Sequence, residues 1–224
     1  MEYTNLAYVA AAVLFIIGIK RLGSPKTAQS GNAIASIGML IAIIATVVSF
    51  DLLDFKLIAI GMIIGSIIGA TFAIRVQMTQ MPQMVAIFNG FGGGASALVA
   101  ASEFFTKHGT ADLNTFISGT IILSVFIGTL TFSGSFIAFG KLQGFVSGKP
   151  IVFSGLQILN GFMVIGIVLI GTLITIGVNQ DLNLFYGIVV LAVLLGVTLT
   201  IPIGGADMPV VISLLNSYSG IAAS

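Results

Sequence analysis

The sequence predicts an all-α protein, a polytopic bundle of transmembrane helices. Three observations support this prediction: the 224 residues are 57% hydrophobic and only 7% charged, the mean hydropathy is +1.17, and the apolar residues fall into long runs. Soluble domains are about a quarter charged, so eight basic and seven acidic side chains cannot cover this chain in water. The runs are about twice as long as barrel strands and do not alternate strictly, which favours helices over an outer-membrane barrel.

Eight segments are long enough to cross a hydrocarbon layer of roughly 30 Å, which requires about 20 apolar residues of helix. They are residues 3–19, 32–50, 57–74, 84–102, 116–139, 156–177, 184–203 and 208–224. All five prolines lie in connections or near helix ends, where they are tolerated. Residues 1–224 are therefore expected to form one transmembrane domain.

The basic residues predict the orientation of this domain. Six of the eight lie in the first, third, fifth and seventh connections, namely Lys20, Arg21, Lys26, Arg75, Lys141 and Lys149. The even connections carry the other two, Lys56 and Lys107, beside most of the acids, namely Asp51, Asp54, Glu103, Asp112 and Asp181. Because basic residues accumulate on the cytoplasmic side of short loops, we expect the N-terminus outside.

The residue inventory excludes several functions. The chain has no cysteine and one histidine, His108, which rules out disulfides, iron–sulfur clusters and Cys/His zinc sites. A net charge of +1 provides no basic surface for nucleic acid. The N-terminus lacks the basic start of a signal peptide, so the first run is expected to remain as a span.

Two of the predicted helices begin with the same pattern. Residues 81–93 align without gaps with residues 208–220, and both read Met-Pro, six residues, Asn, small, aromatic, small, Gly. Asn89 and Asn216 each follow the proline by seven residues, which places them roughly 10 Å into the membrane at 1.5 Å per residue. The two carboxamides either line one polar path or each bond to a neighbouring helix.

Titratable side chains are missing from the middle of every predicted span. An asparagine can orient water but cannot carry a proton, so if this chain conducts protons, water or a partner subunit must supply the carrier. Toward its cytoplasmic end the fifth span also carries a patch of four hydroxyls, for which bonds back to their own helix are the simplest interpretation. They belong to Thr129, Thr131, Ser133 and Ser135.

Asp207 stands in a short turn just before the second Met-Pro helix. Its charge is favoured there by the helix dipole, and it also suits a docking contact with a soluble domain. The two roles are compatible.

Three strings closely resemble the beta subunit of proton-translocating NAD(P) transhydrogenase, and the resemblance extends over essentially the whole chain. They are residues 78–86, residues 132–142, and residues 204–211 with 216–220. The resemblance covers the membrane domain only. It implies a multi-pass protein of the bacterial inner membrane that couples hydride transfer between NADH and NADP⁺ to inward proton movement. Other, soluble domains of the complex bind NAD(H) and NADP(H), so this chain is expected to hold no cofactor, metal or hydride-transfer site.

The same resemblance implies roles for four residues. Asn216 and Ser135 match polar residues of the proton path, and Asp207 matches the acid that couples to the soluble NADP(H) domain. Many family members carry a histidine where this chain has Asn89. For members that lack this histidine, as this chain does, the resemblance implies that an alpha-type membrane subunit supplies the titratable His, within a dimer of alpha–beta units.

The last run, 208–224, stops without a cap or a charge. We therefore expect a ninth span and a soluble NADP(H)-binding domain beyond it. The alternative function is the membrane domain of a secondary transporter for a small solute, whose repeated Met-Pro helices would frame the solute site. A purely structural membrane anchor is a third interpretation.

Overall fold

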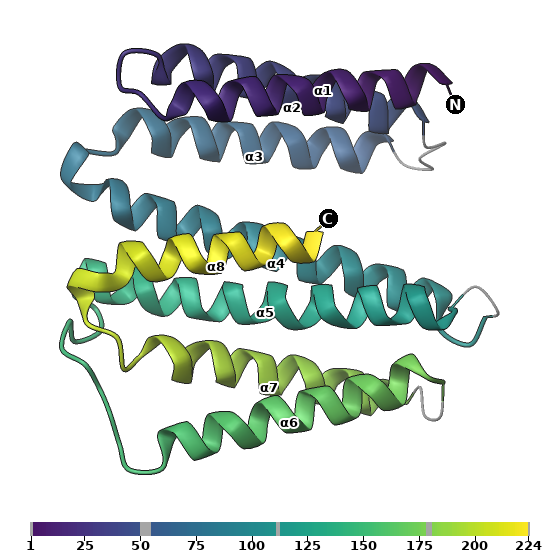
Figure 1. The fold of residues 1–224 in the computed structure, drawn as a ribbon, viewed down its shortest axis with the longest axis vertical. Helices are drawn as coiled ribbons and strands as arrows, with labels where there is room; N and C mark the ends of the chain where they lie inside the picture. The colour runs from purple at the N-terminus through teal and green to yellow at the C-terminus, as the bar shows by residue number, and fades with distance from the viewer. Residues whose placement is uncertain (1, 50–54, 111–112, 178–180, 224) are drawn as a thin grey trace. The chain divides into compact units, whose positions relative to one another are not determined.

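A computed structural model describes residues 2–49, 55–110, 113–177 and 181–223, and in these ranges the chain forms helices and no strand. Figure 1 shows their order. The helices are α1 (Glu2–Leu22), α2 (Ala28–Ser49), α3 (Phe55–Arg75), η1 (Met78–Gln80), α4 (Met81–Lys107), α5 (Thr115–Gln143), α6 (Leu156–Thr175), α7 (Leu182–Thr200), η2 (Gly205–Asp207) and α8 (Met208–Ala223). Each predicted span corresponds to one α-helix, which confirms the all-α prediction. The predicted span ends at residues 50 and 224 lie outside the described residues.

Seven of these helices, α1 to α7, are long and apolar enough to cross a membrane. Helix α8 has 16 residues, or roughly 24 Å at 1.5 Å per residue, so the eighth span stays a prediction. The orientation stays a prediction too, and three of the acids used for it, Asp51, Asp54 and Asp112, lie outside the described residues.

The chain divides into two compact units, residues 1–71 and 72–224. In the first unit, α1 and α2 form an antiparallel hairpin whose backbones approach closely. A Cβ atom added to Gly38 would lie 3.1 Å from the carbonyl oxygen of Ala11. The hydroxyl groups of Tyr8 and Thr46 lie 2.9 Å apart and link the far ends of the two helices.

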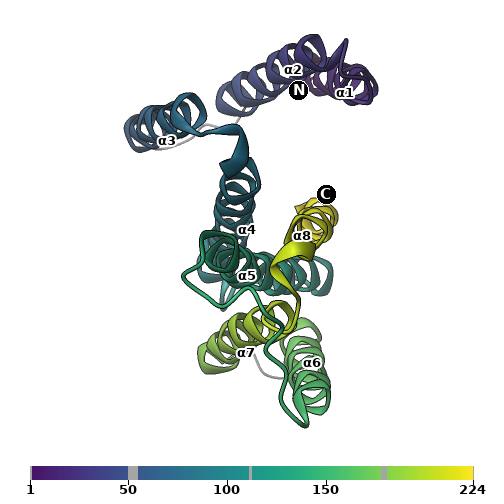
Figure 2. The same cartoon turned by 90° about the vertical axis from the view of Figure 1, so that its left-hand side faces the viewer.

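The second unit is organised around α5, which packs against α4, α6, α7 and α8. Figure 2, which looks along the helices, shows α5 among these neighbours. Glycines allow the closest contacts: a Cβ atom on Gly128 would lie 2.6 Å from the carbonyl oxygen of Gly93 in α4. On another face of α5, a Cβ atom on Gly134 would lie 2.9 Å from Oγ1 of Thr200 in α7. Small residues commonly bring membrane helices together in this way.

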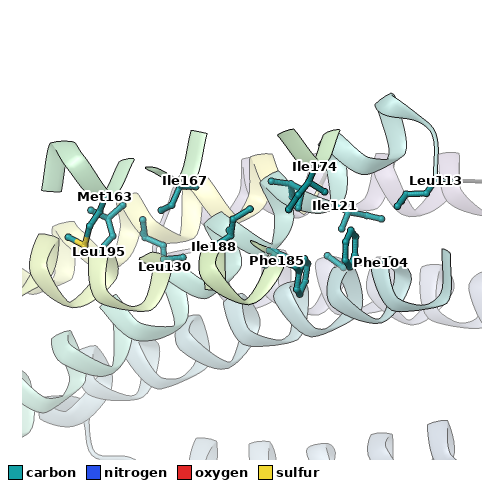
Figure 3. Packing of buried hydrophobic residues seen from close by; sticks show 14 of the residues in the cluster. Phe104, Leu113, Ile121, Leu130, Met163, Ile167, Ile174, Phe185, Ile188 and Leu195 are labelled. Atoms are coloured by element: carbon teal, nitrogen blue, oxygen red, sulfur yellow. The ribbon is translucent and has the colours of Figure 1, made fainter. Parts of the chain in front are cut away.

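Two apolar clusters fill the second unit. The larger lies mainly among α4, α5, α6 and α7 and also includes Leu215 of α8, and Figure 3 shows most of its buried side chains. At one end of this cluster the rings of Phe104 and Phe185 stack with their centroids 4.4 Å apart. The smaller joins α4, α5 and α8 through Ala86, Ala138 and Met208. The second cluster closes the end of the unit at which α4 and α8 begin and α5 ends.

Candidate functional site

Helices α4 and α8 begin in the same way, as the repeated motif predicts. Each follows a three-residue 3₁₀ turn, η1 or η2, and each has methionine as its first residue and proline as its second. The N–H of Met81 bonds to the carbonyl of Met78, and the N–H of Met208 bonds in the same way to Gly205. Proline suits this position because its missing N–H has no partner within the first turn.

A groove of about 680 Å³ lies between α4 and α8. Four pairs of residues that the sequence alignment makes equivalent line it from the two sides: Pro82 and Pro209, Val85 and Ile212, Asn89 and Asn216, Gly92 and Ser219. These positions recur every three or four residues, so they share one face of each helix. The structure thus brings the two predicted carboxamides to one groove.

Asn89 is held by the neighbouring helix. Its Nδ2 donates a hydrogen bond of 2.8 Å to Oγ of Ser135 in α5. Ser135 is fully buried behind the groove, whereas Asn89 is partly exposed to it. For Asn89, then, the interpretation of an amide bonded to a neighbouring helix is correct, and the same bond links two of the predicted site residues.

Asn216 differs from its counterpart. Its side chain is exposed in the groove, and among the described residues its carboxamide has no hydrogen-bond partner. Within the described residues, the interpretation of a bond to a neighbouring helix therefore fails for Asn216. An amide that faces the hydrocarbon of a membrane without a partner is costly, so water or another protein must satisfy it.

A second polar link between helices lies close by. The hydroxyl of Ser219, which lines the groove, lies 2.8 Å from Oγ1 of Thr131, a fully buried residue of α5. This pair was not predicted, because the four hydroxyls of the patch were expected to bond to their own helix; Ser133 does so, whereas Thr131 and Ser135 bond to other helices. A signal was present: Thr131 and Ser135 are four residues apart, so they share a helix face.

The groove contains polar but no titratable side chains. Its polar lining consists of the two asparagines with Ser213 and Ser219, and the rest is apolar or glycine. Such a lining can orient water but cannot release a proton.

Asp207 lies outside the groove. It is the last residue of η2, directly before α8, and its side chain is exposed at the end of the unit where α4 and α8 begin. Of the four predicted site residues, then, two line the groove, Ser135 supports one of them from behind, and Asp207 marks the start of α8.

Comparison with known proteins identifies one family. The family model for the NAD(P) transhydrogenase beta subunit matches residues 4–224. Two curated relatives from Rhodospirillum rubrum, both described as NAD(P) transhydrogenase subunit beta, are 41% identical to the chain over 226 aligned positions. These positions cover 99% of this chain and 48% of each relative. The chain therefore spans about half the length of the curated relatives it matches.

Proposed function

Because this chain belongs to the NAD(P) transhydrogenase beta subunit family, we propose that it is the membrane part of a proton-translocating NAD(P) transhydrogenase. In this role it couples hydride transfer between NADH and NADP⁺ to inward proton movement. NAD(H) and NADP(H) bind to other domains of the complex, and those domains catalyse hydride transfer. The unmatched half of the relatives leaves room for a ninth span and a soluble NADP(H)-binding domain.

The observation that carries this proposal is the carboxamide of Asn216, which has no hydrogen-bond partner in the described part of the chain. It faces a groove in a largely apolar helix bundle, where a polar group without a partner is costly and is therefore a candidate for function. Asn89 stands at the equivalent position opposite, and its bond to Ser135 fixes the direction of its amide. We propose that these three residues orient water molecules along a proton path between α4, α5 and α8.

The proton carrier comes from a partner. No lining residue of the groove titrates, so a side chain with a pKa near neutrality has to be added from outside, and histidine is the usual choice. The exposed side chains of Val85 and Phe88 leave the groove accessible from the surface of the unit. A helix of the alpha-type membrane subunit fits there, with its histidine beside Asn89 and Asn216.

Asp207 connects the path to the nucleotide chemistry. It is exposed directly before α8, so a soluble NADP(H)-binding domain that docks on it can shift the helix that carries Asn216. Alternating access requires such a two-state element. For this docking Asp207 has to face the cytoplasm, which agrees with an N-terminus outside the bacterial inner membrane. The complete enzyme is proposed to be a dimer of alpha–beta units.

The test uses the complete alpha–beta complex in proteoliposomes. Proton movement across the vesicle membrane should begin only when both nucleotides are supplied, and it should stop when hydride transfer reaches equilibrium. Proton movement driven by a small solute without nucleotides would instead support a secondary transporter. Hydride transfer without any proton movement would leave only the anchor interpretation.

A further inference from the structure

Lys141 is a buried lysine at the end of the central helix. The sequence pattern assigned it to the fifth connection, but it lies in the last turn of α5 and is only 4% exposed. Its Nζ donates three hydrogen bonds, of 3.1 Å to the carbonyl of Lys149, 2.6 Å to that of Ile201 and 2.8 Å to that of Ile203. An ammonium group has three donors, so backbone carbonyls use all of them.

These carbonyls belong to two different connections. Lys149 lies between α5 and α6, whereas Ile201 caps the end of α7 and Ile203 lies in the segment that leads to η2. The two connections also bond to each other, since the N–H of Gly205 donates to the carbonyl of Gly148 at 2.8 Å. Lys141 therefore joins three segments of the chain at one point.

The hydrogen-bond cluster around Lys141 lies between the proposed proton path and Asp207. Lys141 follows Ser135 by six residues on the same helix, about 9 Å along its axis. On the other side, Ile203 precedes Asp207 by four residues. One ammonium group thus connects the helix behind the groove to the segment that carries Asp207.

The positive charge of the Lys141 ammonium group makes its hydrogen bonds to the two connections strong. A buried charge is tolerated only when hydrogen bonds replace its hydration, and the last carbonyls of a helix carry partial negative charge. Among the residues that the structure describes, no carboxylate forms an ion pair with Lys141. The carbonyls of the α7–α8 segment are thus its main compensation, so this segment cannot leave α5 without exposing a bare charge.

We propose that Lys141 is a positioning residue, which makes the α7–α8 segment and α5 move as one body when the soluble domain acts on Asp207. This inference rests on the proposed function for its consequence, tighter coupling of proton movement to hydride transfer. If Lys141 only satisfied the carbonyls at the end of α7, it would stabilise the fold without affecting the coupling of proton movement to hydride transfer.

The test compares Lys141→Met with Lys149→Met in the complete alpha–beta complex. Both changes remove one positive charge from the same end of the unit, but the Lys149 side chain is exposed and only its backbone carbonyl takes part in the cluster. Lys141→Met should lower the number of protons moved per hydride by at least fivefold, while hydride transfer in detergent continues. Amides of residues 201–207 should also exchange with deuterium at least tenfold faster. Lys149→Met should match the wild type in both measurements.

Two results would overturn the inference. One is an unchanged ratio of protons to hydride in Lys141→Met, whatever its exchange rates. The other is an equal loss of coupling in both variants, which would point to surface charge instead of the three hydrogen bonds. Failure of the proposed function itself would be recognised separately, because the wild-type complex would then move no protons.

A measurement on the unmutated complex keeps the inference testable if Lys141→Met does not accumulate. Addition of NADP⁺ should change deuterium exchange in residues 201–207 and in residues 140–146, the end of α5 and the start of the next connection, by similar factors. A change confined to residues 201–207, or no change in either segment, would contradict joint movement.

Discussion

Replacement of Asn216 by leucine separates a functional role from a structural one. Leucine removes the carboxamide and keeps a side chain of similar size on α8. Because the Asn216 side chain has no hydrogen-bond partner among the described residues, the change breaks no bond within the described fold. We therefore expect the variant to accumulate and unfold like the wild type.

The expected effect on proton movement follows from the loss of one polar group beside the proposed path. A water molecule in the groove loses a hydrogen-bond partner, and an unsatisfied polar group costs about 1–3 kcal/mol. At 1.4 kcal/mol per tenfold change, proton movement should slow by about 5- to 140-fold. The change Asn89→Leu should combine a similar loss with lower stability, since it also breaks the interhelical bond to Ser135, a bond worth about 0.6–1.7 kcal/mol in membranes.

The assay measures proton uptake and hydride transfer by the complete complex in proteoliposomes, together with thermal unfolding in detergent. Ser217→Leu is the matched control, because Ser217 is the next residue of α8, is exposed and does not line the groove. This control should retain wild-type coupling. Wild-type coupling in Asn216→Leu as well would refute the assignment of the groove as a proton path.

Three further predictions concern packing, orientation and the proton carrier. Gly128→Val should destabilise the protein by about 1–3 kcal/mol, since the new side chain collides with the backbone of α4, whereas Gly61→Val, with open space around it, should leave the thermal midpoint unchanged. The chain has no cysteine, so a single cysteine at exposed Ser24 should react with an impermeant maleimide only from the cytoplasm and one at Thr110 only from outside; the opposite pattern would reverse the orientation. Asn89→His should restore proton movement to a complex whose alpha subunit has lost its histidine, and an inactive but assembled variant would argue against a carrier at this site.

The fold was largely predictable because one physical requirement dominates it. In hydrocarbon each backbone N–H and carbonyl must be satisfied within the protein, and outside a closed barrel a spanning segment achieves this as a helix, so long apolar runs become helices. The ends were less predictable, because apolar character and helical geometry are different properties. The predicted span 84–102 extends to residues 81–107 in the structure, for example, since Met81 and Pro82 start the helix and Lys107 still belongs to it.

The site was predictable in part. The repeat placed Asn89 and Asn216 at equivalent positions, and an equivalent face on two neighbouring helices is enough to form one groove. The partners on α5 were not predictable. They lie 46 and 88 positions away in the sequence, and residues so far apart meet only through packing. Lys141 was counted as a loop charge for the same reason: nothing in its local sequence shows that three carbonyls from other segments surround it.

The two sides of the groove are equivalent in sequence but not in bonding, and this difference bears on the mechanism. Helix α5 offers one hydroxyl to each side, Ser135 to Asn89 on α4 and Thr131 to Ser219 on α8. The bond on the α4 side fixes the asparagine, whereas the bond on the α8 side fixes the serine one turn further along and leaves Asn216 without a hydrogen bond to any described residue. A change at the start of α8 can therefore reorient Asn216 while Asn89 stays in place. Proton access would then be controlled from the α8 side, and Ser219→Ala should affect the coupling more than it affects the stability of the bundle.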